Sequence, residues 1–152
     1  MNPIDHIQIG WLTANLGDFN RRQRRLIMLA AVAPDIDGIE TILSPFIKHN
    51  LLNTLHHHTF GHNLFYAGLV SIILAAIEKE KRGLIFILSL GMVLLHFLTD
   101  ILTAADWLIP PLWPLSNFEF NLMTIFAGPG ANLEEWDFWL KVVVQWILKV
   151  GV

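Results

Sequence analysis

The sequence contains no cysteine among its 152 residues. Without a thiol, the chain cannot form a disulfide, bind a metal through thiolate or use a cysteine nucleophile. Any metal ion must therefore be held by histidine nitrogen and carboxylate oxygen, and the chain has seven histidines and 13 acidic residues for that purpose.

Charged residues are also scarce. They make up 15% of the chain, whereas a soluble domain carries about 25%, and apolar residues reach 54%. This composition excludes a disordered chain, which lacks the apolar surface to form a core. The net charge of −3 makes nucleic acid an unexpected partner, because such binders present a basic face. A membrane protein or an unusually apolar helical domain remains, with one domain over residues 1–152.

Apolar segments separated by turns predict an all-α, up-down bundle of four to five helices, embedded in a membrane. The start of the chain lacks the pattern of a signal peptide. A loop is expected at 34–38, after the second helix, and an irregular, proline-rich cap at about 106–130 precedes the last helix. Residues 39–55 give too weak a signal to assign an element. The expected helices cover about 4–16, the segment that follows a basic turn at 21–25 and continues to about 33, then 59–78, 83–105, and 132 to the end.

Two stretches of the chain carry no Asp, Glu, Lys or Arg. They cover residues 60–77 and 83–99, which is 18 and 17 residues, and a spanning helix needs about 17–25. We therefore expect a multi-pass cell-membrane protein whose partner is the lipid bilayer. The alternative is a buried hairpin in a soluble bundle.

Basic residues are concentrated in two turns of the predicted bundle. Seven of the ten lie at 21–25 and 79–82, and in an up-down bundle these turns share one end. By the positive-inside rule that end faces the cytoplasm. The opposite end, where the histidines gather, then faces the other side of the membrane.

His96 and Asp100 are four residues apart on a predicted helix, so both side chains leave the same face. By itself such a pair is a hydrogen-bonded couple or part of a metal site. The bundle topology favours the metal site, because His62 and His96 lie at one level when each residue adds about 1.5 Å. His6, Asp35 and Asp37 reach the same end. Such a cluster suits Zn, Mn, Fe or a di-metal centre.

The order of these motifs resembles that of the LexA-binding, inner-membrane-associated metal-dependent hydrolases over about residues 6–120. The motifs are an early His, PDID, an HxxxxH that opens an apolar helix, HxxxD, and PLWPLS. The resemblance implies that Trp113, Pro114 and Ser116 lie near the site, with Trp113 and Ser116 contacting substrate. It implies a metal site formed by His6, Asp35, Asp37, His57, His62, His96 and Asp100.

The middle motif departs from the family pattern. In the family it resembles HRxxTHS, and here the arginine and the Thr–Ser pair are missing. On a helix, His58 and His62 can share a face, whereas His57 must lie in the preceding loop; the resemblance favours His57. A similarity to zinc-dependent phospholipase C and single-strand nucleases is weaker, because no histidine follows His96.

These residues lead to the hypothesis of a metal-dependent hydrolase acting on an ester or phosphoester, with a lipid as one candidate substrate. The divalent ion is zinc first, with manganese or iron as alternatives, and Asp35, Asp37 and His62 take the catalytic roles. The alternative is a non-catalytic membrane protein that binds metal or a partner protein. A vestigial site also stays open. A transporter is disfavoured, because no second cluster lies along the bundle.

Overall fold

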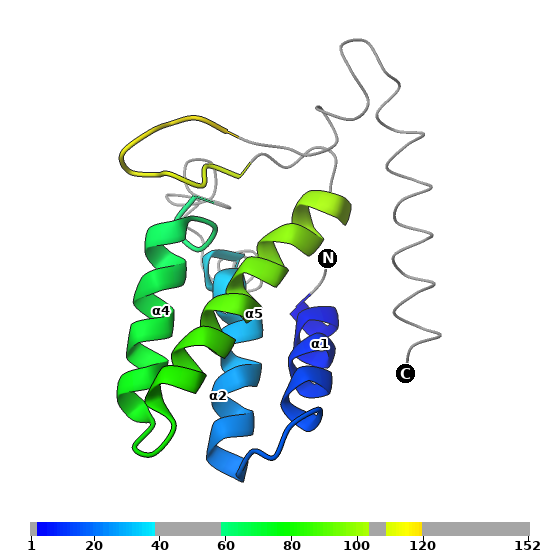
Figure 1. Cartoon of the computed structure of the whole chain (residues 1–152). Helices are drawn as coiled ribbons and strands as arrows, with labels where there is room; N and C mark the ends of the chain where they lie inside the picture. The colour runs from blue at the N-terminus through cyan, green and yellow to red at the C-terminus, as the bar shows by residue number, and fades with distance from the viewer. Residues whose placement is uncertain (1–2, 39–58, 104–108, 120–152) are drawn as a thin grey trace, which may run out of the picture.

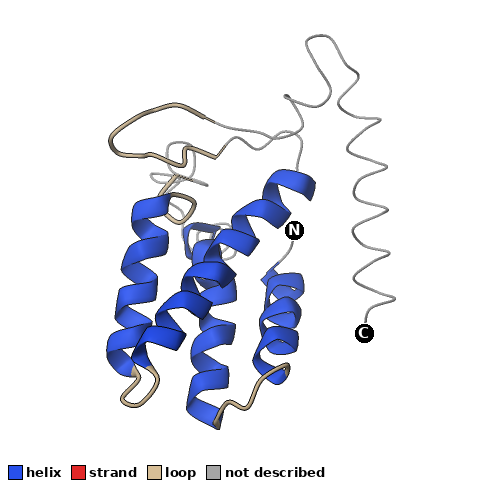
Figure 2. Ribbon diagram, in the orientation of Figure 1, coloured by secondary structure: helices blue, strands red, loops and turns tan. Residues whose placement is uncertain are grey.

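The computed structural model describes residues 3–38, 59–103 and 109–119. Within these ranges the chain forms four α-helices, one short 3₁₀ helix and no strand, as Figure 2 shows. Successive helices run in opposite directions (Figure 1). For this part of the chain, the predicted all-α, up-down arrangement is confirmed.

The first two helices are α1, Pro3–Asn15, and α2, Arg21–Val32. Asn20 caps α2, because its side chain accepts hydrogen bonds from the backbone N–H groups of Arg22 and Gln23, and Gln23 caps Asn20 in return. This capping box fixes the start of the helix. The prediction of a basic turn before the helix was therefore wrong, since the arginines form the first turns of α2 itself.

Gly10 allows α1 to pack closely against α2. A Cβ added at Gly10 would lie 2.7 Å from the Cβ of Ala31, which is closer than packed side chains allow. Ala14, Ala30 and Ala31 are fully buried in the same contact. Small side chains therefore bring the two helix axes together.

The segment predicted as a loop after α2 is a 3₁₀ helix, η1, Ala33–Gly38. Pro34 has no backbone N–H to continue the α-helical pattern, and the chain tightens into the 3₁₀ form that is common at helix ends. The hydroxyl of Tyr66 donates to the carbonyl oxygen of Ala33 at 2.8 Å and so ties η1 to the next helix.

Helix α4, Leu64–Ile77, begins five residues later than the predicted start at 59. Asn63 sets this start, because its side-chain oxygen accepts from the Tyr66 N–H at 2.8 Å while its amide donates to the Thr59 carbonyl. The 14 residues of α4 span about 21 Å at 1.5 Å per residue, less than the ~30 Å hydrocarbon layer of a bilayer. Because α4 begins at Leu64, His62 lies in the bend that precedes the helix.

Helix α5, Arg82–Thr103, packs against α4 as the predicted antiparallel hairpin, and also against α2. The order of the helices across the bundle is therefore α1, α2, α5, α4 (Figure 1). Ile27, Ile85 and Val93 are fully buried in the core between them. Among the described helices, α5 alone is long and apolar enough to cross a membrane, over Arg82–Leu102. The two apolar stretches thus differ in helix length, and of the described helices α5 is the one that fits a membrane span.

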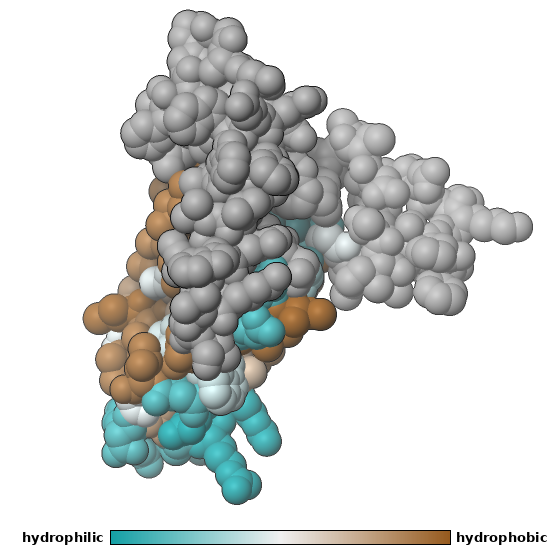
Figure 3. Space-filling model, turned by 90° about the vertical axis from the view of Figure 1, so that its right-hand side faces the viewer, coloured by the Kyte–Doolittle hydropathy of each residue, from teal (hydrophilic) through white to brown (hydrophobic). Residues whose placement is uncertain are grey.

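The basic residues at 21–25 and at 79–82 lie at the same end of the bundle, as predicted. Arg22 donates to the carbonyl oxygen of Ile77, and Lys81 donates to that of Asp18. Figure 3 shows hydrophilic side chains at this end and an apolar surface above it. Helix α4 also exposes apolar side chains, among them Phe65, Leu69 and Ile72, which are half exposed.

Part of the predicted proline-rich cap, 109–119, is described and is irregular, as expected. It is joined to the start of α4, because the N–H of Leu64 donates to the carbonyl oxygen of Pro111 at 3.0 Å. The predictions for 39–55, for the rest of the cap and for the final helix from Asn132 lie outside the described residues, as do His57 and His58.

Candidate metal centre

Helix α1 contributes His6 to the far end of the bundle from the basic turns. His6 lies one turn before Gly10, so both face α2 and α5. Its side chain is buried, its Nε2 lies 3.1 Å from Oδ1 of Asp100, and its ring stacks on that of His96 with centroids 3.6 Å apart. The close approach at Gly10 is what allows His6 to reach these residues of α5.

Helix α5 contributes His96 and Asp100, one turn apart and both buried. The Nδ1–H of His96 donates to the carbonyl oxygen of Ala31 at 2.7 Å, so Nε2 is the atom that carries a lone pair in the neutral ring. That Nε2 is buried without a hydrogen-bond partner, and it lies 3.1 Å from Oδ2 of Asp100 and 3.7 Å from Oδ1 of Asp35. Metal-binding histidines share this arrangement, with the other ring nitrogen held by a carbonyl.

Asp35 enters the cluster from η1. Its Oδ2 is buried without a hydrogen-bond partner. Burial raises the pKa of Asp35, and the nearby His96 and His6 oppose this rise. A partly buried carboxylate with a buried, unsatisfied oxygen is costly unless a proton or a cation neutralises it.

His62 joins the cluster from the bend before α4. Its Nδ1 lies 3.1 Å from Oδ2 of Asp37, and its Nε2 lies 3.2 Å from Oδ2 of Asp100. Burial lowers the pKa of His62, but the hydrogen bonds to Asp100 and Asp37 outweigh it and raise the pKa to about 9. The backbone N–H of Gly61 also donates to Oδ2 of Asp37, at 3.1 Å.

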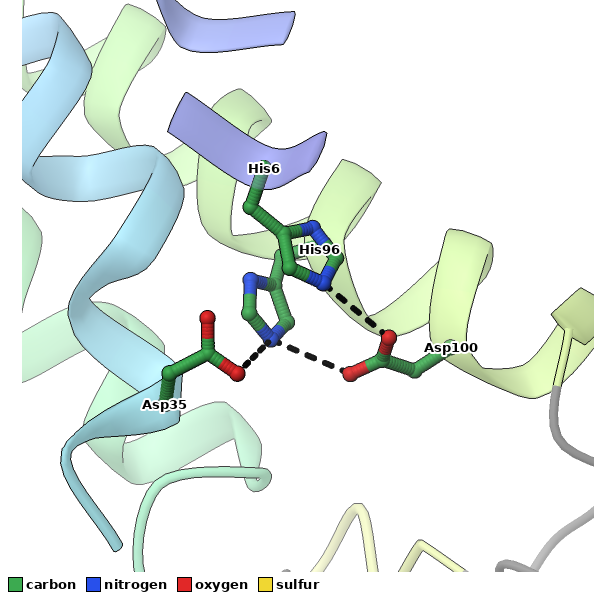
Figure 4. Close-up of side chains that lie close together, drawn as sticks. All are labelled: His6, Asp35, His96 and Asp100. Carbon is green, nitrogen blue, oxygen red and sulfur yellow. Dashed lines mark hydrogen bonds and ion pairs between the residues drawn. The ribbon is translucent and has the colours of Figure 1, made fainter. Parts of the chain in front are cut away.

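Four of these residues form a group that can hold a metal ion. Each offers one ligand atom, and the four atoms lie within 4.8 Å of one another (Figure 4). Two imidazole nitrogens and two carboxylate oxygens match the four-coordinate set that zinc accepts. The group consists of His6, Asp35, His96 and Asp100.

The charge of the site also favours a cation. All seven lysines and arginines of the described residues lie at the basic end, so within this part of the chain only histidine can be positive at the other end. The three carboxylates of Asp35, Asp37 and Asp100 are thus balanced by protons on histidine or by a bound cation. Buried charges need such compensation.

The structure brings together six of the predicted site residues from α1, η1, α5 and the bend before α4: His6, Asp35, Asp37, His62, His96 and Asp100. Their convergence at one level was predicted, whereas their roles as ligands and catalysts stay predictions. His57, the seventh predicted ligand, lies outside the described residues.

The predicted substrate-binding residues of the cap lie apart from this network. Trp113 packs edge-on against Phe60 with ring centroids 5.0 Å apart, and Ser116 accepts a hydrogen bond from the Phe118 N–H. Within the described residues, no hydrogen bond or ion pair joins Trp113 or Ser116 to the cluster. Trp113 is nevertheless close to the bend that carries His62, through its contact with Phe60.

Sequence analysis missed two glycines that position the site. A Cβ at Gly61 would overlap the carbonyl oxygen of Pro34 and lie 3.0 Å from Oδ2 of Asp37, so only glycine lets the bend contact η1. Gly10 likewise allows α1 to pack closely against α2. The sequence signal for Gly10 is its position four residues after His6, whereas the signal for Gly61 is its position next to His62 within the HxxxxH motif.

The fold and this cluster define a helical-bundle protein with a His/Asp group that could hold a metal ion. The chain belongs to the YdjM inner membrane protein family, whose model matches residues 1–150. Comparison with curated proteins and with solved structures gave no match.

Proposed function

We propose that this protein is a membrane-bound, metal-dependent hydrolase that activates water against an ester or phosphoester. The observation that carries the proposal is the Nε2 atom of His96, which is buried, lacks a hydrogen-bond partner and faces Asp35 and Asp100. Because Nδ1 of His96 already donates to the Ala31 carbonyl, a cation satisfies the lone pair on Nε2 without changing the ring's protonation. Zinc is the first candidate, with manganese or iron as alternatives.

In this proposal His6, Asp35, His96 and Asp100 hold the ion. A bound divalent cation lowers the pKa of water toward ~7 and polarises the substrate oxygen. His62 is the proposed general acid, because both of its ring nitrogens face carboxylate oxygens, those of Asp37 and Asp100, which favours the protonated ring. Asp37 thus acts as the positioning carboxylate, as in other His–Asp pairs, and Asp35, whose Oδ2 has no hydrogen-bond partner, is the proposed proton acceptor.

The proposed hydrolysis is balanced by water alone. The water oxygen bonds to the acyl carbon or the phosphorus, and the bond from that atom to the leaving oxygen breaks. Asp35 takes the water proton and His62 gives a proton to the leaving oxygen, which departs as an alcohol; a proton passing from Asp35 to His62 restores the site. Trp113 and Ser116, in the cap that is joined to the start of α4, are the proposed contacts for the substrate.

Metal content tests the proposal directly. Elemental mass spectrometry on detergent-purified protein should find about one zinc, manganese or iron ion per chain. The double variant His96→Ala, Asp100→Ala should lose both the ion and any ester or phosphoester turnover. Ser89→Ala is the matched control, because Ser89 is buried on the same helix and its hydroxyl makes no hydrogen bond. Equal metal content in all three proteins would contradict the proposal.

We further propose that the protein is multi-pass and that the basic turns face the cytoplasm. The apolar length of α5 and the grouping of seven basic residues at one end support this orientation. The cysteine-free chain allows a direct test by single cysteines at the exposed positions Lys79 and Asn117. A membrane-impermeant maleimide added to spheroplasts, whose outer membrane has been removed and whose inner membrane is intact, should label only N117C. Labelling of K79C alone would show that the protein has the opposite orientation in the membrane.

A non-catalytic, partner-binding function is the second candidate, and the LexA-binding family that the sequence resembles suggests it. The feature that favours it is the basic end, which is remote from the cluster and exposes Arg21, Arg22 and Arg25. Partner capture that survives the loss of His62 and His96, in a protein without metal, would support this candidate over the hydrolase.

A further inference from the structure

An apolar cavity of about 490 Å³ opens between α2, η1 and α4. Its volume lies within the range of about 300–1,000 Å³ that is typical of small-molecule sites. The walls are almost entirely hydrocarbon, and the side chains that define it include Leu29, Val32, Ile36, Val70 and Ile73.

Among the described residues that line this cavity, Asp35 alone carries a charged side chain, and it is a member of the metal-type group. The hydroxyl of Tyr66, which also lines the cavity, already donates to the Ala33 carbonyl, so the tyrosine presents mainly its ring. The cavity is therefore polar only where it meets the cluster. A ligand that fits it has a hydrocarbon body and one oxygen-bearing end.

The cavity is continuous with the outer surface of the bundle. Leu29, Ile36 and Ile73 line it and are also 54%, 58% and 49% exposed. Ile73 adjoins the exposed apolar face of α4, which includes Leu69 and Ile72. In a protein of an inner-membrane family, such a surface is suited to contact with lipid tails, and a hydrocarbon chain could then enter the cavity without crossing water.

We propose that this cavity binds the hydrocarbon chain of a lipid ester or phosphoester and directs its polar group to Asp35 and the neighbouring metal-type group. This names the substrate class of the proposed hydrolase and in that sense rests on the proposed function. It assigns chain-length selectivity to the walls of the cavity, whereas bond cleavage belongs to the cluster.

Two tryptophan variants on adjacent residues of α4 test the cavity. Ile73→Trp fills it, and Ile72→Trp adds the same side chain at a position that is 59% exposed and outside the cavity. Leu29→Trp fills the cavity from α2 and replaces Ile73→Trp in the test if that variant gives too little folded protein. Metal content and thermal unfolding check that each variant is folded.

The measurement is kcat/KM for chromogenic esters and phosphoesters of increasing chain length, with direct binding of a fluorescent polyene fatty acid. In wild type and Ile72→Trp, kcat/KM should rise by up to about fourfold per methylene group, the value for complete burial. Ile73→Trp should abolish this dependence on chain length and weaken fatty-acid binding at least tenfold.

The outcomes separate the two proposals. Metal-dependent turnover that is independent of chain length and unaffected by Ile73→Trp would overturn the lipid site and keep the hydrolase. Fatty-acid binding that Ile73→Trp removes, without turnover of any substrate, would keep the lipid site and overturn the hydrolase. Absence of both binding and turnover would overturn both.

Discussion

The two ends of this bundle treat ionisable side chains in opposite ways. At the basic end, side chains such as Arg22 and Lys81 reach across to backbone carbonyl oxygens and stay in water. At the other end, His6, His96 and Asp100 are buried and interact with one another. Exposed charge pairs contribute about 0–1 kcal/mol, whereas breaking a buried pair costs about 3–5 kcal/mol. Stability and function should thus depend far more on the buried end.

The largest effect is expected from Asp100→Ala. Asp100 lies within 3.2 Å of three histidine nitrogens, those of His6, His62 and His96. Its loss should destabilise the protein by about 3–5 kcal/mol and abolish metal binding. Thermal unfolding in detergent, with and without added zinc, measures both effects. If zinc still raised the unfolding temperature of the variant, Asp100 would not be a ligand.

Gly61→Ala should have the next largest effect. The added methyl group would overlap the Pro34 carbonyl and push the bend away from η1, and overpacking of this kind costs about 1–3 kcal/mol. Turnover should fall because His62 moves with the bend, and metal affinity should fall because the clash with Pro34 displaces η1, which carries Asp35. The matched control is Gly68→Ala, where a Cβ meets nothing within 4 Å. That control should be stabilised by about 0.5–1 kcal/mol, as is usual for glycine within a helix.

Gly10→Ala should act through α1. A Cβ there would lie 2.7 Å from the Cβ of Ala31, so α1 must shift outward and withdraw His6 from Asp100. We expect a loss of about 1–3 kcal/mol in stability and weaker metal binding, measured by competition with a chromogenic chelator. Unchanged metal affinity together with lower stability would show that His6 packs in the bundle without binding the ion.

The smallest effect is expected at the basic end. Arg22→Ala removes an exposed side chain that donates to the Ile77 carbonyl, and this should cost less than about 1 kcal/mol. Metal content and turnover should equal those of wild type. A loss of metal in this variant would break the comparison, because it would couple the two ends of the bundle.

The convergence of the cluster could be predicted because it depends on short-range rules. Helix rise and the up-down order place His62 and His96 at one level, and the four-residue spacing places His96 and Asp100 on one face. The same rules placed the two basic turns together, and hydrogen bonds of Arg22 and Lys81 bear this out. These features follow from periodicity and chain direction, which the sequence specifies locally.

Other features could not be predicted in this way. The start of α4 depends on which of several polar residues caps it, and Asn63 does so with hydrogen bonds in both directions. The prediction of a longer helix consequently placed His62 on a helix face, whereas its position in the bend lets it contact Asp37. The choice among competing caps is made by tertiary packing.

The sequence by itself determined the helical class, the absence of thiolate ligands, the two polar ends and the set of histidines and aspartates that meet. Only the tertiary structure decided which of them share one ion-sized space, why glycine is required at 10 and 61, and that an apolar cavity leads to Asp35. The reason is the range of the interactions. Periodicity and capping act over a few residues, whereas contacts such as His6 with Asp100, 94 residues apart, depend on how whole helices pack.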